Sequence, residues 1–134
     1  MKTDITGKED VQLIVRSFYA KVLNDNLLQP IFQHTHDHNR EHFLEVMDRF
    51  WMNILFYTGG YNGNPLQTHK ELHKLKNLTP LHFTRWLLHF NETVDEMFEG
   101  EKANLAKQRA YALATVMQMK ILNIEINPLS DSIY

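Results

Sequence analysis

The chain has 134 residues, a formal net charge of −2 at pH 7 and no cysteine. This length suits one compact domain, and 43% hydrophobic residues can supply its core. The nearly balanced charge gives no electrostatic reason to expect nucleic acid or an anionic membrane as a partner. The lack of cysteine excludes disulfides and thiolate metal sites, so the eight histidines become the leading candidate metal ligands.

The start of the chain, MKTDITGKEDV, lacks the apolar stretch of a signal peptide. No run of about 18 apolar residues occurs, so no membrane-spanning helix is expected. We therefore expect a soluble protein of the cytoplasm.

Helical periodicity dominates the first half of the chain. The first helix is predicted to follow a capping box of Thr6 and Glu9. Its apolar stripe consists of Val11, Ile14, Val15, Phe18, Tyr19 and Val22. Turn-forming residues and Pro30 then predict a break. The polar stretch QHTHDHNRE that follows, residues 33–41, is interpreted as either a loop or the start of the next helix.

A second long helix is predicted from about Asn39 to Tyr57, ended by Gly59 and Gly60. Its inner stripe is expected to be Phe43, Val46, Met47, Phe50, Ile54 and Leu55. The turn YNGNP, residues 61–65, then leads into a short helix over about Pro65 to Lys76.

Two further helices complete the predicted fold. Thr79 as N-cap and Pro80 at the first helical position predict the start of one, which Gly100 ends. Its inner face holds Phe83, Trp86, Leu87, Phe90, Val94 and Met97. The last helix is predicted over about Lys102 to Leu122, with Leu105, Ala106, Ala110, Leu113, Met117 and Ile121 inward. The sequence thus predicts one all-α domain over residues 1–134, with four long helices, one short helix and a flexible tail from about residue 123.

The short helix carries the most informative histidine. Leu66, His69 and His73 share one of its faces by the three- and four-residue rule. A histidine buried among leucines needs partners for its ring nitrogens, and these could be a backbone carbonyl or a metal. Haem iron held by one neutral imidazole fits an apolar, aromatic pocket. From the residues alone, a structural histidine and a plain aromatic core remain the commoner interpretations.

Six segments occur in a particular order along the chain: FYAKV (18–22), PIF (30–32), FW (50–51), YNGNPLQTH (61–69), HFTRWLLHF (82–90) and QRAYALA (108–114). The ordered set closely resembles the truncated haemoglobins, specifically group III, over about residues 8 to 122. The resemblance implies a truncated globin fold, in which the helices form a sandwich around a haem b group. It also implies one iron that binds O2 and, in addition, NO, CO or cyanide.

The resemblance assigns His69, which follows the Gly-Asn-Pro turn, as the proximal ligand of the haem iron, aimed by that rigid turn. Tyr19 and Trp86 match the distal tyrosine and tryptophan of the family, which can donate hydrogen bonds to a bound ligand. Each such bond would contribute about 1 to 3 kcal/mol and slow the release of O2. The alternative is that both are core residues with satisfied polar tips. The haem is expected to be surrounded by Phe32, Phe43, Met47, Phe50, Leu66, Leu72, His73 and Phe83.

The distal helix departs from the family pattern. Many relatives place a histidine seven residues before the phenylalanine of FW, where this chain has Phe43. His42 stands one residue earlier, about 100° away around a helix. We therefore expect Phe43 to cap the pocket with an apolar ring, and His42 to reach the iron only after a local shift.

Other polar residues have competing interpretations. His34, His36 and His38 could bind Zn or Cu on a loop, but a hydrated loop is favoured. HKELH, residues 69–73, lacks the glutamate of the zinc-protease motif. Basic residues that could contact the haem propionates, besides His73, are Arg49, Lys74, Lys76 and Arg85.

Three functions follow as hypotheses. The first is an O2-binding module or sensor, expected to be a monomer. The second is an NO dioxygenase or a peroxidase-like enzyme, which would need a reductase or an oxidant, because the chain has no flavin-binding or Rossmann signature. The third is a helical protein without haem that carries a metal site on a loop.

Overall fold

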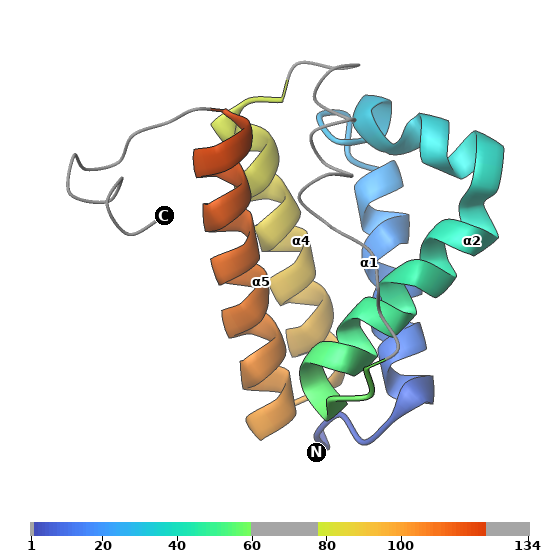
Figure 1. Ribbon diagram of the computed structural model, residues 1–134, viewed down its shortest axis with the longest axis vertical. Coiled ribbons are helices and arrows are strands. Elements are labelled where there is room, and N and C mark those ends of the chain that lie inside the picture. Colours follow the sequence, from blue (N-terminus) through green and yellow to red (C-terminus); the bar gives the residue numbers. More distant parts are fainter. Residues whose placement is uncertain (1, 60–77, 123–134) are drawn as a thin grey trace.

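A computed structural model describes residues 2–59 and 78–122, except for the side chains at 34–39 and 121. Four helices form in these ranges: α1 (Lys8–Leu23), α2 (Gln29–Phe56), α4 (Pro80–Met97) and α5 (Glu101–Ile121), labelled as in Figure 1. Figure 1 shows α4 and α5 running side by side in opposite directions, with α1 and α2 beside them. α1 packs on α2 and α4, and α5 packs on α4 and α2. The all-α class predicted from the sequence is confirmed.

The apolar stripe predicted for α1 is confirmed, because all its members are buried except the half-buried Phe18. The predicted capping box is wrong. Thr6 donates its backbone N–H and its hydroxyl to the carboxylate of Asp10, at 2.8 and 3.0 Å, instead of pairing with Glu9. Gly7 is the residue at the N-cap. Asp10, four residues after Thr6, therefore accepts the hydrogen bonds that the sequence assigned to Glu9.

α2 begins at Gln29, ten residues before the predicted start at Asn39, and the polar stretch 33–41 is helical. Pro30 lies in the first turn, where its missing N–H costs no hydrogen bond, so it starts the helix rather than interrupting the chain. Figure 1 shows that α2 changes direction along its length. It ends at Phe56, because Tyr57 adopts a left-handed conformation with φ of 55°.

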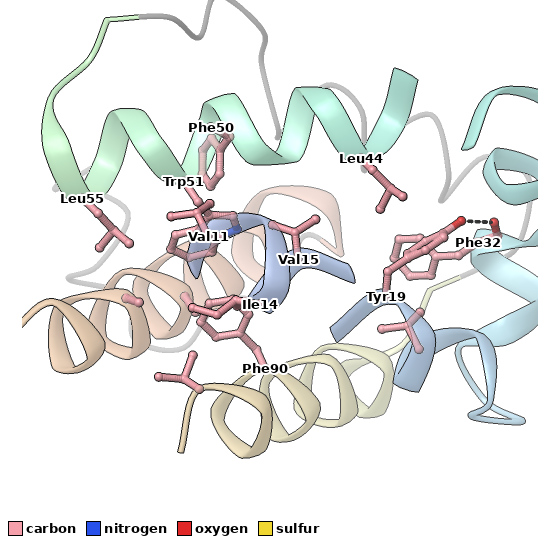
Figure 2. Packing of buried hydrophobic residues seen from close by; sticks show 14 of the residues in the cluster. Val11, Ile14, Val15, Tyr19, Phe32, Leu44, Phe50, Trp51, Leu55 and Phe90 are labelled. Atoms are coloured by element: carbon pink, nitrogen blue, oxygen red, sulfur yellow. Dashed lines mark hydrogen bonds between the residues drawn. The ribbon is translucent and has the colours of Figure 1, made fainter. Parts of the chain in front are cut away.

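The centre of the core is aromatic. Phe90 of α4 is 1% exposed and stacks on Trp51 of α2, with ring centroids 4.7 Å apart. Phe18 of α1 contacts the ring of Phe90 edge-on, with the two ring centroids 5.4 Å apart. Figure 2 shows Trp51, Ile14 and Phe90 meeting where α1, α2 and α4 approach one another. These contacts fix α2 against α1 and α4, which places the rest of α2 relative to the candidate site.

The junction between α4 and α5 is held by the N-terminal segment. Asp4 accepts backbone N–H groups of Lys102 and Ala103, both at 2.9 Å, and so satisfies the exposed donors at the start of α5. Burial alone would raise the pKa of Asp4, but these bonds and the charge of Lys102 lower it below its usual 3.8. Gly100 is required here, because a Cβ on it would lie 2.5 Å from Cγ of Asp4.

α4 begins as predicted. Thr79 is its N-cap and forms a capping box with His82, whose ring Nδ1 accepts the Thr79 backbone N–H at 3.0 Å. Pro80 takes the first helical position. α5 begins and ends one residue earlier than expected, within the usual uncertainty of a helix end. No helix in residues 2–59 and 78–122 is long and apolar enough to cross a membrane.

Candidate functional site

An apolar cavity lies where the start of α2, the start of α4 and the end of α5 come together. It measures about 20 Å³, and its exposed wall is wholly apolar. It is lined by Leu28, Ile31, Phe32, Leu78, His82, Phe83, Trp86, Ala114 and Met117. Two of the residues expected around a haem, Phe32 of α2 and Phe83 of α4, are therefore brought together with Trp86 of α4, the predicted distal tryptophan.

Tyr19 of α1 lies between the cavity and the part of α2 that carries Phe43. Its side chain is 4% exposed, and its ring packs against Phe43 with centroids 5.2 Å apart. Its hydroxyl donates to the backbone carbonyl of Phe32 at 3.4 Å, a long bond. Figure 2 shows this bond as a dashed line between α1 and the beginning of α2. Because Phe32 lines the cavity, Tyr19 is in contact with both the cavity wall and Phe43.

α2 presents a second apolar face beside the one packed on α1. Phe43, Met47, Phe50 and Ile54 recur at helical spacing, and only Phe50 among them is fully buried. His42 is exposed, while Phe43 is half-buried against Tyr19. The exposure of His42 agrees with the expectation that it does not point straight at the iron, but its relation to the iron and the role of Phe43 in covering a ligand both stay predictions.

The stripe predicted for α2 was incomplete. Leu44 and Trp51 are buried and were not on it, whereas Val46 is only half-buried. The buried face repeats at Leu44, Asp48, Trp51 and Leu55, which lie on one side of the helix. A charged residue at position 48 interrupts the apolar pattern, so the sequence did not indicate this face. Asp48 can be buried there because Arg16 of α1 donates hydrogen bonds to both of its carboxylate oxygens, at 2.8 and 2.9 Å.

Arg85 has a partner within the protein. It donates to the buried carboxylate of Asp25 at 2.7 Å, and His89 Nε2 contacts the same oxygen at 2.6 Å. The backbone N–H groups of Leu27 and Leu28 bond to the other oxygen. Burial alone would raise the pKa of Asp25, but the hydrogen bond from His89, those from the backbone and the charge of Arg85 lower it below its usual 3.8. Arg85 thus anchors α4 to the turn before α2, which weakens its candidacy as a propionate partner.

Several expected site residues lie outside the described part of the chain. These are Leu66, His69, Leu72 and His73, together with the basic candidates Lys74 and Lys76. The backbone of His34, His36 and His38 belongs to α2 rather than to a loop, but their side chains are not described. Among the described residues, no group of three or more His, Asp or Glu is placed to hold a metal ion.

His82 and Ala114 line the cavity but were not assigned to the site from the sequence. Both occur in segments that carry the family resemblance, HFTRWLLHF and QRAYALA, which was the available signal. The bond from Thr79 to Nδ1 of His82 leaves its Nε2 as the nitrogen that carries the proton. His82 therefore adds an imidazole ring to a lining that is otherwise apolar and aromatic.

The chemistry of these walls fits a porphyrin. Its faces need apolar, aromatic neighbours, and a polar ligand on the iron needs a small number of aimed donors. The cavity supplies the first, and Tyr19 and Trp86 are the available donors next to it. Since the cavity alone has room for about one water molecule, a haem needs the neighbouring face of α2 as well. The helical architecture and this apolar, aromatic site are those expected of a globin.

The chain matches the family model for bacterial-like globins over residues 3–123. It belongs to the bacterial-like globin family. It is 31% identical over 121 residues to the group 3 truncated hemoglobin ctb of Campylobacter jejuni, covering 88% of this chain and 93% of that relative. Its structure is similar to the crystal structure of the group III truncated hemoglobin from Campylobacter jejuni, with a TM-score of 0.79 and 29% identity. That match covers 90% of this chain and 95% of the crystallised one.

The resemblance to group III truncated haemoglobins and the truncated globin fold are both confirmed by these matches. Membership of the globin family implies a haem iron cofactor.

Proposed function

We propose that this chain binds haem b through His69 and reversibly binds O2 and related diatomic ligands, as a monomer in the cytoplasm. When bound, the haem iron would supply the site at which O2, NO, CO or cyanide binds. The observation that carries the proposal is the position of Tyr19, whose buried hydroxyl lies among aromatic rings between Phe43 and the cavity wall.

Tyr19 is well suited to hold a polar ligand. Its present acceptor, the Phe32 carbonyl, is 3.4 Å away, so a nearer and more negative acceptor would compete for the proton. The side chain of Tyr19 is only 4% exposed, and a hydrogen bond made in buried surroundings is stronger than one made in water. Trp86 adds an indole N–H, which is a donor only. Phe43, in place of the histidine of many relatives, contributes an apolar ring and no proton.

A second candidate function rests on the same pair of donors. Tyr19 and Trp86 could equally stabilise a reacting oxygen species, which would make the chain an NO dioxygenase or a peroxidase-like enzyme that uses an external reductase. Fast consumption of NO or peroxide with a reductant present supports this function. Slow O2 release with little such turnover supports ligand binding.

The test of the proposed function is a variant at the proximal ligand. His69→Gly should lose haem, and added imidazole should restore the absorption band, because it supplies the missing iron ligand. His42→Ala is the matched control, since His42 is exposed and should leave haem content unchanged. A His69→Gly protein that retains haem without imidazole would refute the assignment, and a wild-type protein that refuses added hemin would refute the function.

A further inference from the structure

A second cavity opens between α1 and α2 on the other side of Tyr19. It measures about 230 Å³, and its lining includes Tyr19 and Leu44, which are both buried. Figure 2 shows these two side chains facing one another between the two helices. The lining also includes Arg16 from α1 and Arg40 from α2. We call this cavity the arginine cleft. No aspartate or glutamate belongs to its described lining.

The two guanidinium groups differ in how they are held. Arg16 is fixed by Asp48, and all the hydrogen bonds described for it are made by Nη1. A guanidinium has five N–H donors, so most of those of Arg16 have no described acceptor. Arg40 is exposed and has no carboxylate partner among the side chains that the structure describes. Arg16, which Asp48 holds in place and whose charge Asp48 balances, can offer its remaining N–H donors, and the exposed Arg40 supplies a second guanidinium. Together with Asn24 in the lining, they suit a small inorganic anion.

Tyr19 separates the arginine cleft from the ligand site. Tyr19 is part of the lining of the cleft, while its ring packs on Phe43 and its hydroxyl reaches the carbonyl of Phe32. An anion held by the arginines is therefore one side chain away from the proposed position of a bound ligand. We propose that the arginine cleft collects small monovalent inorganic anions, of the size of azide or nitrite, and passes them by Tyr19 to the iron. This proposal rests on the proposed function.

The physical consequence is a difference between charged and neutral ligands. Positive charge at the mouth of a cleft can raise the association rate of an anion by about 10- to 1,000-fold, and salt suppresses the effect. A neutral ligand such as CO gains nothing from the same charges. The arginine cleft should therefore make anion binding fast and dependent on ionic strength, while CO binding should be insensitive to both charge and salt.

The first experiment reverses the charge of Arg40. In Arg40→Glu, azide association with the ferric protein at low salt should slow by at least about tenfold, and its dependence on ionic strength should weaken. CO association with the ferrous protein should stay unchanged. Arg109→Glu, at an exposed position on α5, makes the same change in net charge away from the cleft and should leave both rates as in wild type. Equal slowing in the two variants would mean a general charge effect and would overturn the proposal.

The second experiment detects the anion without using the iron. With the ferrous protein saturated by CO, azide can no longer bind the iron, and its titration should shift the side-chain N–H resonances of Arg16 and Arg40 but not those of Arg109. A haem protein with no such shifts and with equal azide rates in wild type and Arg40→Glu would overturn this inference alone. A protein that takes up no haem would instead refute the proposed function.

Discussion

The two apolar faces of α2 are alike in composition and differ in burial. The face toward α1 and the core is sealed: its apolar members, Leu44, Trp51 and Leu55, are all buried. The face that begins with Phe43 is covered only in part, because Met47 and Ile54 are half-buried. The faces are about 100° apart, one residue in sequence. The difference teaches that one helix can supply the core with one side and leave apolar surface for a cofactor on the other.

The sealed face also contains a charge pair, the one that links α1 to α2 among the side chains that the structure describes. Asp48 and Arg16 connect the helices at a point where apolar packing would otherwise be continuous. Removing one member of a buried pair is costly because the other is left uncompensated. The pair therefore favours, together with the packing of Leu44, Trp51 and Leu55, the rotation of α2 that turns Asp48 toward α1.

The largest expected effect is a difference in the free energy of unfolding between substitutions on the sealed face and on the open face of α2. Leu55→Ala should lower the free energy of unfolding by about 2 to 5 kcal/mol, because a side chain 1% exposed leaves a cavity in the core. Ile54→Ala, at the preceding residue, should cost less, about 1 kcal/mol, because its side chain is already partly exposed to solvent. Urea unfolding of both variants measures the difference. Equal losses would contradict the distinction between a sealed and an open face.

A smaller effect is expected at the polar start of α2, which belongs to neither face. Asp25→Asn should cost about 2 kcal/mol at neutral pH, because the buried carboxylate loses its charge-assisted bonds to Arg85 and His89, both of which are partly exposed. The pKa of Asp25 is lowered on folding, so its contribution is complete above the usual value of 3.8 and is lost as pH falls through the folded value.

The check is unfolding of wild type and Asp25→Asn at several pH values. The difference in unfolding free energy should be constant at neutral pH and should shrink below pH 3.8. A difference that grew on acidification would show that Asp25 is not held in its charged form. Asp95→Asn is the matched control: that carboxylate is exposed and pairs only with Lys107 in the described structure, so little change is expected.

The smallest effect on stability, and the most specific one for function, is expected at the edge of the open face. Tyr19→Phe keeps the ring that packs on Phe43, so unfolding should change by less than about 1 kcal/mol. Release of O2 from the haem protein should become about tenfold faster, if the lost hydrogen bond is worth about 1.4 kcal/mol. Stopped-flow displacement of O2 by CO measures the rate. An unchanged rate would leave Trp86 as the donor, or neither residue.

The sequence predicted α1, α4 and α5 closely, because each carries a regular apolar stripe with clear end signals. Thr79 followed by Pro80 fixed the start of α4 without any tertiary contact, since the cap and the proline act within one turn. The ordered motifs also identified the family before any fold was known. Both results depend on local residue patterns that a single sequence displays.

The tertiary structure decided what neighbouring elements impose. α2 begins at Gln29 although residues 33–39 are polar, and Asp48 is buried because Arg16 of another helix meets it. The partnership of Arg85 with Asp25, 60 residues apart in the numbering, could not be derived from local patterns either. The periodicity of apolar residues predicts which side chains of a helix could be buried. Whether a charged side chain is buried, or an apolar one stays partly exposed, depends on which other helix packs against it.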